Sequence, residues 1–98
     1  MAQASARISE HFLPLTDPRR GKVTYPLFDM VFMAICAVIA GADDFVGIAK
    51  WCQKQRDWLA RFIDLENGIP SHDRFNAVLA MIKPEEFERC FVSWILSL

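Results

Sequence analysis

Arg74 is the side chain in this sequence best suited to contact a nucleic acid. Its guanidinium can bind a phosphate, or pair with guanine through two hydrogen bonds. His72, two residues earlier, could hydrogen-bond a phosphate or a base. Each has an ordinary alternative, because Arg74 could form a salt bridge with Asp73 or another acid and His72 could bond within its own helical turn. The candidate DNA-contacting residues of this segment are Ser71, His72, Arg74 and Asn76.

A second set of basic residues lies in the first 25 positions, where cations outnumber acids. The basic residues there are Arg7, Arg19, Arg20 and Lys22, against Glu10 and Asp17. A flexible basic arm of this composition could touch phosphates, and the alternative is a solvated linker. The candidates for phosphate contact in this arm are Arg19, Arg20 and Lys22.

The remaining reactive residues show no catalytic or zinc-binding pattern. Cys36, Cys52 and Cys90 are widely spaced, with no Cys-x-x-Cys pair and no histidine at zinc-ligand spacing. No serine or cysteine lies near a histidine in a pattern that indicates an activated nucleophile. We therefore expect reduced, mostly buried thiols, no catalytic residue, no bound metal and no cofactor.

Composition indicates one small globular domain. The chain has 98 residues, of which 53% are hydrophobic, enough for a core. Its net charge of −1 and isoelectric point near 6.1 count against tight autonomous binding of nucleic acid. The apolar run at residues 30–42 is too short to span a membrane, which needs roughly 20 apolar residues. With no secretory signal and no cysteine framework, we expect a cytoplasmic protein that does not enter membranes.

Helical periodicity and cap residues predict the elements that must position these side chains. Pro26 and Gly41 bound an almost wholly apolar stretch that should form the central helix. Asp43 or Asp44 can cap the next helix, which should bend or break near Asp57. The expected helical segments are residues 5–13, 26–40 and 45–62, then one helix after Ser71 and one beginning at Pro84.

The turn before Ser71 predicts a pair of helices that resembles a helix-turn-helix. Gly68 and Pro70 break the preceding segment, Ser71 can cap the next helix, and Asp73 suits its first turn. The connection is longer than the tight turn of the standard motif. The expected fold is all-α, a compact bundle of four to five helices. We divide it into an N-terminal helix with a basic linker (residues 1–25) and a helical domain (residues 26–98).

Several separate motifs resemble one known family when they are read in order. The sequence is similar to the N-terminal domain of ISAs-type insertion-sequence transposases, a group that includes the H-repeat-associated proteins, over about residues 12–94. The motifs that carry this resemblance are Asp17-Pro18-Arg19, Tyr25-Pro26-Leu27, Ala37-Val38-Ile39-Ala40-Gly41-Ala42-Asp43-Asp44-Phe45, Trp58-Leu59, Asn67-Gly68-Ile69-Pro70-Ser71-His72-Asp73, Phe75, and Pro84-Glu85 with Phe87.

The resemblance implies a helical accessory domain ahead of a DDE catalytic domain, in which acidic side chains hold two divalent metal ions for strand transfer. We expect that catalytic domain to be absent from this chain. The acids available here instead suit helix caps, first turns and loop flanks, so no metal site is expected among them. They are Asp43, Asp44, Asp64, Asp73, Glu85 and Glu86.

Two functions follow as hypotheses. The first is an accessory domain that contacts or positions element DNA and has no catalysis by itself; its partners would be DNA and a DDE catalytic domain. The second is a helical interaction or dimerisation module, which could be a truncated remnant of a mobile element. Arg74 and Ala77 depart from the threonine and arginine usual in the family, which counts against independent DNA recognition. The second function would use the apolar face that ends at Trp94 to Leu98, and the acidic isoelectric point and high apolar content favour it.

Overall fold

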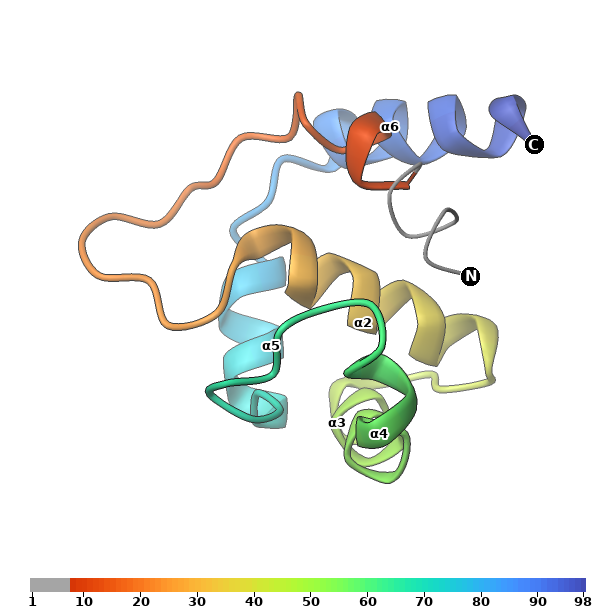
Figure 1. Ribbon diagram of the computed structural model, residues 1–98. Coiled ribbons are helices and arrows are strands. Elements are labelled where there is room, and N and C mark those ends of the chain that lie inside the picture. The colour runs from red at the N-terminus through yellow and green to blue at the C-terminus, as the bar shows by residue number, and fades with distance from the viewer. Residues whose placement is uncertain (1–7) are drawn as a thin grey trace.

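A computed structural model describes residues 8–98, and within them every regular element is helical (Figure 1). This confirms the predicted all-α class. A helical turn at residues 8–11 comes first, and residues 5–7 of the predicted first helix lie outside the described residues. The helices that follow are α2 (Leu27–Ile39), α3 (Phe45–Lys54), α4 (Arg56–Leu59), α5 (His72–Leu79) and α6 (Pro84–Ser97).

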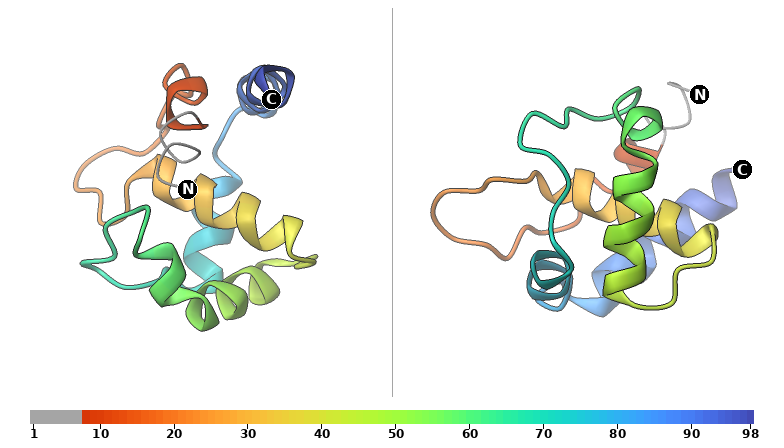
Figure 2. Two further views of the ribbon diagram at one scale, coloured as in Figure 1. Left: turned by 45° about the vertical axis from the view of Figure 1, so that its right-hand side comes forward. Right: turned by 90° about the horizontal axis from the view of Figure 1, so that it is seen from below.

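Helices α2, α3 and α5 pack on one another and form the centre of the molecule, while α4 packs on α3. As predicted, α2 is the central helix, with Met30 and Met33 fully buried. Its last turn differs from that prediction, because Val38 and Ile39 are exposed. Apolar character on every face therefore does not bury the whole helix. In Figures 1 and 2, α2 lies between α6 on one side and α3 on the other.

Local chemistry fixes both ends of the turn between α2 and α3. Gly41 has a φ of +112°, which suits glycine, and its N–H bonds to the Val38 carbonyl at 3.0 Å. The Ala42 N–H reaches the Ala37 carbonyl at 2.9 Å, completing a Schellman motif. The Asp44 carboxylate then accepts the Gly47 N–H at 2.6 Å and caps α3. Gly41 therefore ends α2 and Asp44 begins α3, as the sequence predicts.

Two helix boundaries differ from the sequence-based expectation. Pro26 is the cap residue before α2, with extended ψ of 140°, and Leu27 is the first helical residue. The predicted helix over residues 45–62 is divided at Gln55, whose φ of −100° and ψ of 20° interrupt the helical backbone. The break comes two residues before Asp57, close to the position that the sequence predicts.

The N-terminal segment packs on α6 through apolar and polar contacts. Phe12 is buried against Phe87, with ring centroids 5.6 Å apart. His11 Nδ1 lies 2.8 Å from Ser93 Oγ, and the Thr16 N–H donates to Glu86 Oε1 at 2.9 Å. The first helix was predicted to reach residue 13, but the helical turn ends at residue 11, and the Leu13 side chain is 80% exposed.

Acid is expected to weaken the docking of this segment. The Thr16 N–H, with Lys83 and Arg89 nearby, lowers the pKa of the Glu86 carboxyl. A group with a lowered pKa stabilises the fold above its ordinary pKa, and this contribution is lost as the pH falls through the folded value. Glu86→Gln should therefore lower the melting temperature near neutral pH and reduce the loss on acidification, measured by circular dichroism.

The matched control is Glu85→Gln, an exposed neighbour in the same helical turn. It should leave the melting temperature and its pH dependence close to those of the wild type. Identical melting curves for the two variants at every pH would contradict a role for the Glu86 carboxylate in holding the N-terminal segment.

Candidate nucleic-acid interface

The first turn of α5 is fixed by the cap that the sequence predicts. Ser71 has extended backbone angles, and its Oγ accepts the Arg74 N–H at 3.2 Å. One orphan donor of the helix start is thereby satisfied. Ser71, His72, Asp73 and Arg74 are all exposed. The four residues therefore form an ordered polar turn on the surface.

Burial on the other side of α5 holds this turn in place. Phe75 is completely buried and Val78 nearly so, and α5 packs against both α3 and α2. Asn76, like Arg74, is exposed beside the buried Phe75. Successive residues of a helix point about 100° apart, so burying Phe75 turns its neighbours toward solvent. The structure thus brings Ser71, His72, Arg74 and Asn76 together on one exposed turn and a half.

The polar partners of this turn differ between its histidine and its arginine. His72 Nδ1 lies 3.3 Å from Asp73 Oδ1, which is the local contact that the sequence left open as an alternative. The Arg74 guanidinium makes no ion pair with any group in residues 8–98, although its backbone N–H is used in the cap. Arg74 therefore keeps its donors available, and DNA contact by these residues stays a prediction.

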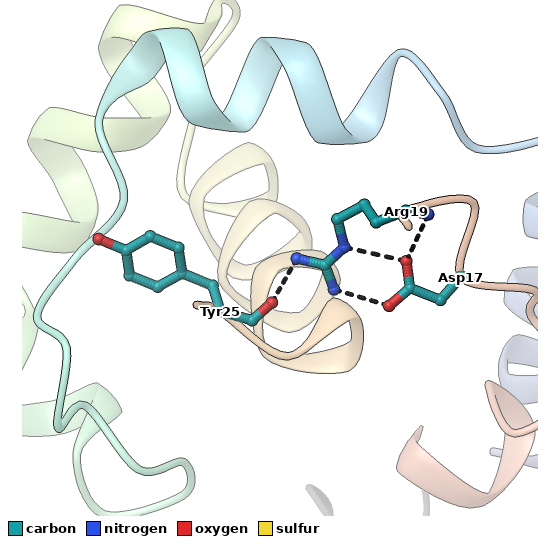
Figure 3. A network of polar contacts seen from close by, with 3 residues as sticks. All are labelled: Asp17, Arg19 and Tyr25. Carbon is teal, nitrogen blue, oxygen red and sulfur yellow. Dashed lines mark hydrogen bonds and ion pairs between the residues drawn. The ribbon is translucent and has the colours of Figure 1, made fainter. Parts of the chain in front are cut away.

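The Arg19 guanidinium forms hydrogen bonds within the protein (Figure 3). Its Nε and Nη2 donate to the two carboxylate oxygens of Asp17 at 2.9 and 2.8 Å, and Nη1 donates to the Tyr25 carbonyl. Only 13% of its side chain is exposed, and its hydrogen bond lowers the pKa of Asp17. The planar guanidinium suits this bidentate pairing with a carboxylate. Arg19 therefore holds the ends of the linker before α2 together.

The other two linker candidates, Arg20 and Lys22, are exposed on either side of Gly21. The linker end is tied to the loop before α5, because Asn67 Nδ2 donates to the Thr24 carbonyl at 3.1 Å. The Tyr25 hydroxyl reaches the Asn67 carbonyl at 3.4 Å. These contacts join the linker to the segment that leads into Ser71, and phosphate contact by Arg20 and Lys22 stays a prediction.

Sequence reasoning assigned no function to one group of cations. Lys50, Lys54 and Arg56 lie on α3 and α4, Arg61 follows shortly after, and all four are exposed. The available signal was the local charge, since residues 50–61 hold four basic residues and one acid, Asp57. The view from below in Figure 2 shows α3 and α4 in front, with the start of α5 beside them.

An apolar groove of about 520 Å³ opens on another part of the surface. It runs between α2 and α6 and receives side chains from α3 and α5. No charged side chain lines it. The groove is lined by Val31, Ala34, Ile35, Val38, Ile39, Ile48, Leu79, Ile82, Pro84, Phe87 and Phe91.

The thiols do not have the properties of nucleophiles. All three cysteines are unpaired, Cys52 and Cys90 are buried and Cys36 is half-buried, which agrees with the prediction of mostly buried thiols. Burial raises the pKa of Cys36 to about 11, and burial with Cys36 nearby raises that of Cys52 to about 12. Both thiols are therefore protonated near neutral pH.

Two further kinds of feature are absent from the described part of the chain. Across residues 8–98, no group of three or more His, Cys, Asp or Glu side chains is arranged to hold a metal ion. Over the same residues, no helix has the length and hydropathy needed to cross a membrane.

Removing the Ser71 cap should destabilise the interface. Ser71→Ala leaves the Arg74 N–H without its acceptor and should cost about 1 kcal/mol of folding free energy. For a domain of this size the melting temperature should fall by roughly 4–8 °C. Ser71→Asp, which can still cap, is the control and should melt near the wild-type temperature. Equal melting of wild type and Ser71→Ala would show that the cap contributes nothing.

A family model and several curated relatives match most of this chain. A family model described as DDE_Tnp_1-associated matches residues 9–95. The uncharacterized protein in the dhlA 3' region of Xanthobacter autotrophicus is 42% identical over 82 residues, covering 82% of this chain and 28% of that protein. The H repeat-associated putative transposase YhhI of Escherichia coli K12 is 37% identical over 90 residues, covering 91% and 24%. No solved structure matches the chain.

A shorter relative matches over most of its own length. The inactive transposase YbfQ of Escherichia coli K12 is 36% identical over 78 residues, covering 79% of this chain and 93% of that protein. By contrast, the chain spans about a quarter of the length of the two relatives above. These matches confirm the resemblance to H-repeat-associated transposases. The chain therefore belongs to the DDE_Tnp_1-associated family.

Proposed function

We propose that this chain is an accessory domain of a DDE-type transposase that contacts element DNA and does not itself catalyse strand transfer. Family membership supports the transposase context, and YhhI, which is named as a putative transposase, extends well beyond the matched part. We assign the divalent-metal chemistry of such enzymes to that further sequence. The chain's own contribution is then to hold DNA in position.

The observation that carries the proposal is Arg74 on the exposed, capped first turn of α5. Its guanidinium has no ion-pair partner in residues 8–98 and lies at the positive end of a helix dipole. Unused backbone N–H groups at such a helix start favour a phosphate oxygen. The buried Phe75 keeps the turn rigid, so little ordering is needed when DNA binds.

The pair of His72 and Asp73 changes the charge of this turn. The Asp73 carboxylate beside His72 adds negative charge at the surface, which opposes approach of a phosphate. Together with the net charge of −1, this predicts modest affinity that is strongly dependent on salt. A weak accessory contact fits a domain that works beside another DNA-binding part of the same protein.

Loss of Arg74 should weaken DNA binding. Arg74→Ala is expected to lower affinity for a labelled duplex about tenfold, near 1.4 kcal/mol, and to flatten the salt slope by about one. Fluorescence anisotropy over a salt series measures both quantities. The control is Arg89→Ala, which removes the same charge from α6. Wild-type affinity in Arg74→Ala, or an equal loss in the two variants, would contradict a specific role for Arg74.

Self-association is a second candidate function, favoured by the apolar groove between α2 and α6. The occupant would be a second copy, in which Ile95 and Leu96 at the end of α6 and the following Leu98 are exposed. Apolar surface of this kind, left uncovered, favours association. This proposal concerns a face different from the first turn of α5.

Sedimentation equilibrium tests that candidate. If the groove is filled by another copy, the mass should rise with concentration, and Ile39→Lys should return it to the monomer. Leu13→Lys is the matched control, because Leu13 is also exposed and does not line the groove. A monomer at all concentrations, or equal dissociation by both variants, would eliminate the second candidate.

A further inference from the structure

Positive charge is concentrated in one segment of an acidic chain. Residues 50–61 hold four basic side chains and one acid, a net charge of +3 in a chain whose net charge is −1. We call Lys50, Lys54, Arg56 and Arg61 the α3–α4 cations. Helix α6, by contrast, contains three glutamates and one arginine. The charge is therefore separated between elements rather than spread evenly.

The α3–α4 cations have no partners within the described residues. All four are exposed, and no salt bridge or side-chain hydrogen bond in residues 8–98 involves any of them. On α3, Ile48 and Cys52 are buried, while Lys50 and Lys54 lie on the solvent side. Asp57, the one acid of the segment, forms no ion pair with a neighbour there. These cations are available to an external anion.

Helix stability alone does not account for the arrangement. Lys54 in the last turn of α3 interacts favourably with the helix dipole. Lys50 is four residues earlier, however, and like charges at that spacing repel by a few tenths of a kcal/mol, roughly 0.2–0.5. The pair Lys50 and Lys54 is therefore unfavourable until an anion lies between or beside the two ammonium groups.

Helices α3 and α4 lie on the side of the molecule that also presents the start of α5. Helices α3 and α5 pack directly on each other. Figure 2, viewed from below, shows α3 and α4 in front, with the first turn of α5 directed toward the viewer and α6 behind. Figure 1 shows the same order, with α3 and α4 at the bottom and α6 at the top. Helix α6, which carries the three glutamates, is therefore on the far side.

We propose that the α3–α4 cations bind the phosphate backbone of the same DNA duplex that the first turn of α5 contacts. The inference rests on the proposed function and extends its interface to a second helix. Lys50 and Lys54 neutralise phosphates, which sets the register of the duplex, while Arg74 on α5 makes the neighbouring contact. The acidic and apolar surface of α6 stays away from the DNA.

Lysine footprinting tests this directly, because the four lysines divide among three surfaces. Lys22 is in the linker, Lys50 and Lys54 are on α3, and Lys83 precedes α6. The intact chain is acetylated with and without a duplex at low salt, and each site is quantified by mass spectrometry. Lys50 and Lys54 should be protected several-fold on DNA binding, whereas Lys83 should react equally in both samples.

A double variant gives the second readout. Lys50→Gln with Lys54→Gln should flatten the salt slope of duplex binding by about two, since each phosphate that is no longer neutralised reduces the slope by about 0.9. Lys83→Gln with Arg89→Gln removes the same charge from the other side and should keep the wild-type slope. Melting curves show whether each variant is folded, and the exposed positions on α3 should tolerate the change.

The outcomes separate the two proposals. Duplex binding that depends on Arg74, with Lys50 and Lys54 as reactive as in the free chain, would overturn this inference and leave the proposed function standing. Protection of Lys22 in place of the α3 lysines would also overturn it, moving the phosphate contact to the linker. No duplex binding by the wild type at the lowest salt would overturn both.

Discussion

The burial of Phe75 between α5 and the helices it packs on is the interaction that the rest of the interface depends on. Phe75 is fully buried, and its immediate neighbours Arg74 and Asn76 are exposed as a direct result of helix geometry. The Ser71 cap then orders the turn before it. One apolar anchor and one hydroxyl thus determine which polar side chains α5 presents and hold them on a rigid element.

Much of the fold could be predicted because its signals are local. Gly41 ends α2, Asp44 begins α3 and Ser71 begins α5, each through hydrogen bonds that span only a few residues. The break near Asp57 was predicted, but its exact position at Gln55 and the exposure of Leu13 were not, since they depend on backbone geometry and packing that a periodic pattern does not encode. Propensity and periodicity describe one element at a time.

The candidate site was only partly accessible from sequence. The residues of the α5 turn are neighbours in the chain, so their grouping followed from helix periodicity. Arg19 could not be placed this way, because its third hydrogen bond goes to the Tyr25 carbonyl and exists only when the linker is folded back. The α3–α4 cations received no function from the sequence, because the position of α3 beside α5 depends on the packing of two helices that are separated along the chain.

Charge separation reconciles an acidic chain with the proposed contact to DNA, since a local potential can differ in sign from the net charge. An NMR titration of the labelled chain with duplex DNA tests this most directly, because it maps every backbone amide at once. The account predicts shift changes concentrated in α5's first turn and in α3 and α4, with α6 unaffected. Changes confined to α6 and the groove, or none at low salt, would contradict it.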